Sequence, residues 1–149
     1  MPAKSHLSFA MKLACLFIPA AFAGPLAAQV SAPKLALELN NSAEIEGACR
    51  LTFVATNETG VALEGLSYEI VLYDPDGIVP DDGFLLFEFG RMPEGKTKVV
   101  QFVLENRDCG SISRVLVNDV AECRSAAGSH EFCLDGLSVS SRNAIEFSV

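Results

Sequence analysis

Alternation of apolar and polar residues is the feature that most limits how this chain can fold. In the segment ACRLTFVATNETG, residues 48–60, the side chains of Cys49, Leu51 and Phe53 fall on one face of an extended chain, and the residues between them fall on the other. A period of two indicates a strand with one buried face, and the Asn and Gly that follow indicate a turn. No segment after residue 28 sustains the period of 3.6 residues that a long helix requires.

The same alternation recurs along the chain, interrupted by turn residues. The predicted strands cover residues 34–39, 49–56, 66–74, 84–90, 98–105, 113–120, 137–141 and 144–149. We expect residues 40–47 to form a polar connection and residues 121–132 to hold at most one helical turn. A set of about seven short strands in one small domain favours an all-β, antiparallel sandwich.

The N-terminal residues predict export. Lys4 and Lys12 precede an uncharged apolar segment, residues 13–28, which ends in small residues. This is the composition of a cleaved signal peptide. We therefore expect residues 1–28 to be removed and residues 29–149 to form a single β-sandwich domain.

Several features of this leader remain open in the sequence. Cleavage after Ala23 fits as well as cleavage after Ala28, and Met11 also fits as the initiating residue. A lipid anchor on Cys15 fits poorly, because Lys12 stands where a lipoprotein signal has an aliphatic residue. The apolar segment is shorter than a membrane-spanning helix, and Pro and Gly interrupt it, so we expect no stable membrane span after its removal. Without an Arg-Arg pair, the general export route is favoured.

Four cysteines follow the leader, and their even number predicts two disulfide bonds. They are Cys49, Cys109, Cys123 and Cys133, and three pairings are open. We favour Cys123–Cys133, because cysteines ten positions apart suit a closed surface loop, which leaves Cys49 to pair with Cys109. Disulfide bonds and a signal peptide together predict a periplasmic or secreted protein.

Residues 29–149 are acidic, with 9 basic and 19 acidic residues and hence a net charge of −10. This charge argues against binding nucleic acid or an anionic membrane surface, since both require a basic patch. We expect a protein of the cell envelope as the partner. The side chains of Val71, Val99 and Val103 lie opposite the predicted core face. Either they belong to the core in another register, or they form a contact surface.

A family resemblance rests on the segments CRLTFVATNETG, EIVLYDPDG, FEFGRMPEG, SRVLVNDV and LSVSSR. Together they resemble a family of small exported proteins of alphaproteobacteria that have no assigned activity, over essentially the whole chain after the leader. The order of the Asn-containing and Pro-Gly turns also resembles immunoglobulin-like or fibronectin-like modules of bacterial envelopes. The resemblance implies an immunoglobulin-like sandwich whose turns are structural, and it carries over no catalytic residue.

The sequence offers little for catalysis. His130 is the one histidine after the leader, and no nucleophile motif or cofactor-binding motif accompanies it. We therefore predict no catalytic residue, no enzymatic activity and no cofactor. A zinc site made of Cys109, Cys123, His130 and Cys133 is an alternative, but its spacing is unusual and an oxidising compartment favours disulfides. Asn57 begins an Asn-Glu-Thr glycosylation pattern, which we interpret as an unmodified turn.

An acidic loop, residues 74–83, supplies the second functional hypothesis. It carries Asp74, Asp76, Asp81 and Asp82, and carboxylates are the ligands that calcium prefers. The loop does not match the EF-hand pattern, and Asp, Pro and Gly are also ordinary turn residues. The leading hypothesis is therefore an exported, non-enzymatic module for protein interaction or an accessory role in the envelope. A small-ligand or calcium-binding domain that uses this loop is the alternative.

Overall fold

The alternating segments pair into two β-sheets, in a computed structural model that describes Met1 and residues 34–149. The predicted signal peptide, its cleavage sites and Cys15 lie outside the described residues. None of the helices in the described part combines the length and the apolarity that crossing a bilayer requires.

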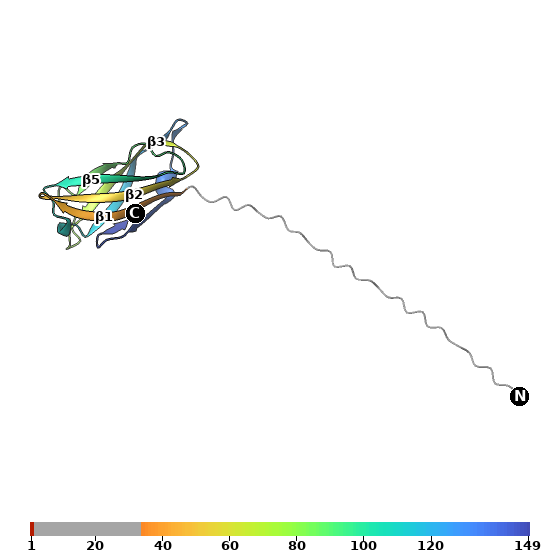
Figure 1. Cartoon of the computed structure of the whole chain (residues 1–149), viewed down its shortest axis with the longest axis horizontal. Coiled ribbons are helices and arrows are strands. Elements are labelled where there is room, and N and C mark those ends of the chain that lie inside the picture. Colours follow the sequence, from red (N-terminus) through yellow and green to blue (C-terminus); the bar gives the residue numbers. More distant parts are fainter. Residues whose placement is uncertain (2–33) are drawn as a thin grey trace. The chain divides into compact units, whose positions relative to one another are not determined.

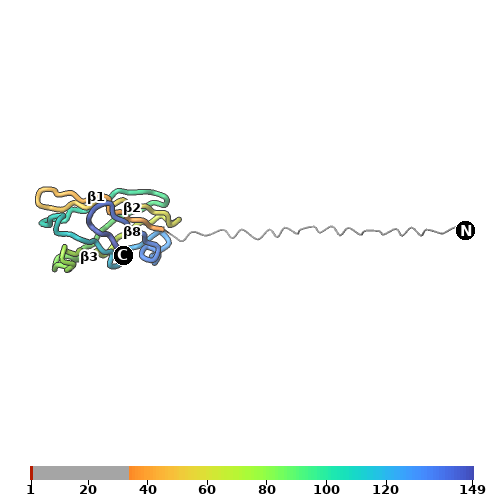
Figure 2. Tube along the Cα trace, turned by 90° about the horizontal axis from the view of Figure 1, so that it is seen from below, coloured from red at the N-terminus to blue at the C-terminus, as the bar shows by residue number. Residues whose placement is uncertain are grey.

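Nine strands and two helical turns make up the described fold. They are β1 (Lys34–Ile45), β2 (Ala48–Glu58), β3 (Leu63–Tyr73), β4 (Phe84–Glu88), β5 (Thr97–Glu105), η1 (Cys109–Ser111), β6 (Arg114–Ser125), β7 (Gly128–Ser129), α1 (Phe132–Asp135), β8 (Leu137–Ser141) and β9 (Glu146–Ser148). The first sheet has the order β5-β2-β1-β8, and β5, β2 and β1 lie side by side in Figure 1. The second sheet has the order β4-β3-β6-β7, with β9 also paired to β6. Figure 2 shows β1 and β2 in one layer and β3 in the other.

The predicted sandwich is confirmed, with two additions. The pairs β1–β2, β2–β5, β3–β4 and β3–β6 are antiparallel, as expected. β8 runs parallel to β1, and β9 runs parallel to β6. Each sheet therefore contains one strand from the C-terminal part of the chain, β8 or β9, that pairs with a strand distant in the sequence.

The expectation of a polar connection at residues 40–47 is wrong. β1 continues through Ile45, with a register shift near Asn40, and turns into β2 through Glu46 and Gly47. Both turn residues have positive φ, 40° and 81°, as a two-residue hairpin of the type I′ class requires. Polar residues can form this part of β1 because the hairpin supplies backbone hydrogen bonds.

The helical turn lies later than expected. Most of residues 121–132 belongs to the end of β6 and to β7, and the helical turn α1 begins at Phe132. The two-residue loop of Ala126 and Ala127 joins β6 to β7, since Ser125 pairs with Gly128. Gly128 has a φ of 122°, which favours glycine at the end of this turn.

The core is built around Phe53 of β2. Its ring makes edge contacts with four other rings at centroid distances of 5.3–5.9 Å: Phe87, Phe89, Phe102 and Phe147. These rings come from both sheets, so one aromatic cluster holds the layers together. Each such pair contributes about 0.5–1.5 kcal/mol beyond the burial of its area.

Two disulfide bonds confirm the pairing that we favoured. Cys49 on β2 is bonded to Cys109 in η1, and Cys123 on β6 is bonded to Cys133 in α1. The first bond attaches the connection between β5 and β6 to the first sheet. The second attaches α1 to the second sheet.

The three outward-facing valines have different environments. Val71 is only 3% exposed, whereas Val99 is 61% and Val103 49% exposed. Neighbouring residues on β4 and β6, Phe84 and Leu116, lie opposite Val71 and explain its burial. Val99 and Val103 lie on β5, at the edge of the first sheet, and stay exposed.

Asn57 fixes the corner at which β2 ends. Its side chain is fully buried, and its amide nitrogen donates to the carbonyl oxygens of Val61 and Met92, at 2.8 and 2.9 Å. Its amide oxygen accepts from the backbone and the hydroxyl of Thr59. Asn57 is therefore a structural turn residue, as the sequence indicated, and its amide is inaccessible to modifying enzymes in the folded state.

Breaking the two disulfides is expected to have unequal effects. Sequence separations of 60 and 10 residues give, by loop-closure entropy, losses of about 4 kcal/mol for Cys49→Ser/Cys109→Ser and about 2–3 kcal/mol for Cys123→Ser/Cys133→Ser. Urea denaturation of the purified variants measures both free energies of unfolding. A greater loss for the second variant would contradict the entropic argument.

Replacement of Asn57 by alanine is expected to lower the free energy of unfolding by about 2–3 kcal/mol, because it removes the hydrogen bonds of a buried amide to the carbonyl oxygens of Val61 and Met92 and from Thr59. The matched control is Asn40→Ala, since Asn40 is exposed and its amide bonds only to the carboxylate of Glu38. The control should change stability by less than about 0.5 kcal/mol in the same urea titration. Equal effects of the two changes would show that burial of the Asn57 amide is unimportant.

Candidate functional site

One edge of β6 is incompletely paired. β3 lies along one side of the strand over nearly its whole length. On the other side, β9 pairs with Arg114–Leu116 and β7 pairs with Arg124–Ser125. No described strand pairs with residues 117–122 on that side, and the carbonyl oxygen of Cys123 already accepts from the backbone N–H of His130 at 2.9 Å. The unpaired residues are therefore 117–122. We call these residues the open edge of β6.

Two bulges shape the open edge. In the pairing with β3, Asn118 and Ala121 have no partner, because the register shifts at both positions. Bulges bend a strand and increase its twist, which interrupts regular pairing with a further strand. On the same side, β7 is only two residues long, and the Cys123–Cys133 bond links β6 to the helical turn α1 that follows it.

A groove of about 560 Å³ lies against the open edge. One wall is β6, and the other wall is the segment from β7 to α1. The groove is lined by Asp119, Val120, Ala121, Glu122, Cys123, Arg124, Ser129, His130, Glu131, Leu134 and Asp135. The residues nearest to the open edge are thus accessible from the solvent through this groove.

The groove carries excess negative charge. Its one arginine, Arg124, is engaged by Glu64 at 2.7 Å and by Glu122 at 3.0 Å. Asp119, Glu131 and Asp135 are exposed and form no salt bridge with any described residue. Glu131 and Asp135 therefore remain available to a positively charged ligand, and Asp119, which accepts from the backbone N–H of Val120 at 2.7 Å, can offer its other oxygen.

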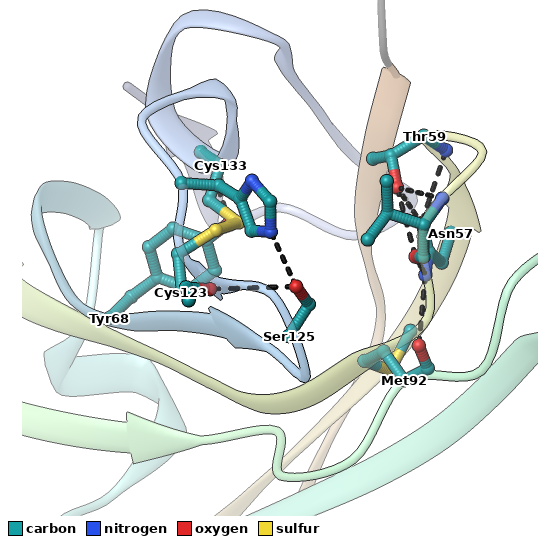
Figure 3. Close-up of a disulfide and its surroundings, with 10 residues drawn as sticks. Asn57, Thr59, Tyr68, Met92, Cys123, Ser125 and Cys133 are labelled. Atoms are coloured by element: carbon teal, nitrogen blue, oxygen red, sulfur yellow. Dashed lines mark hydrogen bonds between the residues drawn. A yellow bond between two sulfur atoms is a disulfide. The ribbon is translucent and has the colours of Figure 1, made fainter.

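Ser125 and His130 form a pair at one end of the groove. The Ser125 hydroxyl and His130 Nε2 are 2.7 Å apart, and Figure 3 shows Ser125 beside the disulfide. Ser125 is only 5% exposed, and its oxygen also accepts from the backbone of Ala127 at 3.1 Å. Within residues 34–149, no carboxylate is hydrogen-bonded to the His130 ring. The pair therefore stabilises the turn between β6 and β7. It differs from a catalytic serine–histidine pair in that the hydroxyl is buried and no described carboxylate orients the imidazole.

Tyr68 of β3 holds the second wall of the groove in place through a hydrogen bond to α1. Its hydroxyl donates to the carbonyl oxygen of Cys133 at 2.7 Å, which ties β3 to α1 (Figure 3). Burial raises the pKa of the Tyr68 hydroxyl well above its usual range, so the group remains a donor at every physiological pH. The hydroxyl and the disulfide together fix the second wall of the groove.

The zinc alternative is not compatible with the oxidised structure. Cys109, Cys123 and Cys133 are all bonded to other cysteines, so none is a thiolate. His130 is directed at Ser125. Among the residues that the structure describes, no three His, Cys, Asp or Glu side chains are grouped as a metal site requires.

Two of the four carboxylates in the acidic loop already have partners within the protein. Asp74 accepts from the backbone of Asp76 and Ile78, at 3.0 and 2.8 Å, which closes the turn. Asp82 pairs with Arg107, and this hydrogen bond lowers the pKa of the Asp82 carboxyl. Asp76 and Asp81 are exposed. The calcium hypothesis remains a prediction, and no observed contact favours it.

Sequence reasoning missed the open edge and the pair formed by Ser125 and His130. Ser125 and His130 are five positions apart, a spacing that matches no recognisable motif, and pairing along an edge is a property of the folded sheet. The short segment between Cys123 and Cys133 was the one available signal, since it forces a tight return of the chain.

Comparison with known proteins adds a distant structural likeness. No protein-family model matches the chain, and no curated protein matches its sequence. Among solved structures, the chain is similar to a DUF1425 family member from Shewanella sp. pv-4, with a TM-score of 0.39 and 17% identity. The likeness covers 57% of this chain and 74% of that chain. The resemblance to exported alphaproteobacterial proteins therefore stays a prediction.

Calcium at about 1 mM, a concentration that saturates or half-saturates most extracellular calcium modules, is expected to leave the melting temperature unchanged. The reason is that Asp74 and Asp82 already have local partners. Calorimetry and thermal unfolding measure the effect, with an Asp76→Ala/Asp81→Ala variant as the comparison. Heat release or a rise in melting temperature in the native protein, absent in that variant, would establish the calcium site.

Proposed function

We propose that this chain is an exported, non-enzymatic module that binds an extended segment of a protein partner in the groove beside β6. The observation that carries this proposal is the open edge of β6, residues 117–122, which faces the groove. An unpaired strand edge presents backbone donors and acceptors that a second extended chain can satisfy.

Strand addition suits the dimensions of the site. A strand advances about 3.3 Å per residue, so the six residues of the open edge match a partner segment of similar length. The neighbouring β7 and β9 limit the segment at both ends. The groove accepts those side chains of the segment that point toward α1.

Charge favours a basic segment. Asp119, Glu131 and Asp135 have no basic partner among the described residues, whereas the guanidinium of Arg124 is already neutralised. Lysine or arginine at alternate positions of the segment would lie on the same side as these carboxylates. The strongly acidic composition of residues 29–149 also speeds the approach of a basic partner.

Two observations support action outside the cytoplasm. Two disulfide bonds are typical of proteins that fold in an oxidising compartment. The basic and then apolar N-terminal residues have the composition of a signal peptide. A binding role without catalysis is supported by the burial of Ser125 and by the absence of an orienting carboxylate for His130 among residues 34–149.

Binding of synthetic peptides tests the proposal. A peptide of about eight residues that alternates lysine and threonine should bind the purified, oxidised protein, and a peptide that alternates glutamate and threonine should not. Methylation of alternate backbone nitrogens in the first peptide should abolish binding, because it removes the donors that pair with β6. Fluorescence anisotropy of labelled peptides measures the affinities.

Variants of the protein locate the site. Glu131→Gln/Asp135→Asn should weaken binding about fivefold, as expected for two solvated ion pairs. The matched control is Asp76→Asn/Asp81→Asn, which removes the same charge from the acidic loop and should leave the affinity within about twofold. Equal binding of methylated and unmethylated peptides, or equal losses in both variants, would rule out strand addition at β6.

A further inference from the structure

A second open edge lies on the opposite side of the sandwich. β5 is the outermost strand of the first sheet, and its nine residues, Thr97–Glu105, pair with β2 without any register shift. The strand contains neither proline nor a bulge, which are two common devices that prevent the pairing of sheet edges. Within the described residues, no strand covers its outer side.

The outward side chains of β5 are apolar at two symmetric positions. Val99 and Val103 are 61% and 49% exposed, and Gln101 lies midway between them. In an antiparallel pairing of two identical strands centred on Gln101, Val99 of each copy lies opposite Val103 of the other. Thr97 lies opposite Glu105 in the same register.

We propose that β5 pairs with β5 of a second copy of this chain, in the antiparallel register centred on Gln101. Two four-stranded sheets then become one continuous sheet across a two-fold axis. The contact is isologous, so the apolar pair of Val99 and Val103 occurs twice. Opposed β-branched side chains on neighbouring strands stabilise such a pairing.

Inward-facing residues of β5 also gain from this contact. Val100 and Phe102 are only partly buried, although both pack against the core, and Phe102 stacks on Phe87 at 4.1 Å. In the proposed register Val100 lies opposite Phe102 of the second copy. Pairing therefore removes the exposed rims of both side chains from water.

The charges of β5 permit the contact. The strand carries one lysine and one glutamate, and neither lies opposite a like charge in this register. Lys98 is already held by the carbonyl oxygen of Phe89 at 2.6 Å, toward the second sheet. Each copy nevertheless carries a net charge of −10 over residues 29–149, so the two copies repel at long range. Screening of that repulsion by salt should strengthen the dimer.

Sedimentation velocity of the full chain, exported and purified in its oxidised form, tests the proposal. We expect the dimer fraction to rise with protein concentration between roughly 1 and 500 μM. Raising sodium chloride from roughly 0.05 to 0.5 M should increase that fraction at fixed protein concentration. A protein that stays monomeric at the highest concentration and salt would overturn the proposal.

Charge variants test the register. Val99→Glu/Val103→Glu places like charges opposite each other and should weaken the dimer at least about tenfold, and Val99→Lys/Val103→Lys should do the same. An equimolar mixture of the two variants should recover the dimer, because every opposed pair is then of opposite sign. Failure of the mixture to dimerise, while each variant keeps the wild-type circular dichroism, would overturn the antiparallel register.

A matched control separates β5 from other exposed apolar residues. Phe84→Glu/Leu86→Glu adds the same charge at two exposed positions of β4, the edge strand of the second sheet. The dimer should survive this change to within about threefold in dissociation constant. A loss as large as that of the β5 variants would assign the interface to β4 instead. Peptide binding at β6 is measured separately and does not depend on this outcome.

Discussion

The packing of two sheets on one aromatic cluster is the interaction on which the rest of this structure depends. Phe53 contributes from the centre of the first sheet, and four other phenylalanine rings meet it from neighbouring strands of both sheets. Since these rings fill the space between the layers, the sheets keep one relative placement. The positions of the edge strands depend on that placement. Both proposed binding surfaces, the open edge of β6 and the outer side of β5, lie at the edges of the sheets.

The strands at the two sides of the sandwich differ in regularity and charge. On one side, β5 and β4 end the sheets with regular strands, and apolar side chains remain exposed on both. On the other side, β6 is bulged, and a disulfide and the hydroxyl of Tyr68 hold α1 over it. The first side offers a straight, weakly charged edge, and the second offers a short, acidic groove. These differences in shape and charge suit different occupants.

Local pattern and non-local pairing explain what could be predicted from the sequence. Alternation placed strands such as β2, β5 and β8 nearly at their observed positions, because burial of one face determines the spacing of apolar residues. Cysteine spacing identified both disulfides. The polar half of β1 was missed, since its order comes from the hairpin with β2. The parallel strands and the open edge of β6 were missed for a related reason: they depend on which distant segments meet. The pair of Ser125 and His130 is a local contact across the turn between β6 and β7, and it was missed because no motif marks a separation of five residues.

The parallel pairing of β8 with β1 has a consequence for the order of events during synthesis. Leu137 lies beside Leu35, so the first sheet gains its outer strand only after nearly all of the described residues have been made. β9 likewise joins β6 late, and with it Phe147 completes the cluster around Phe53. A growing chain therefore lacks its outer strand and part of its central packing until its synthesis is almost complete.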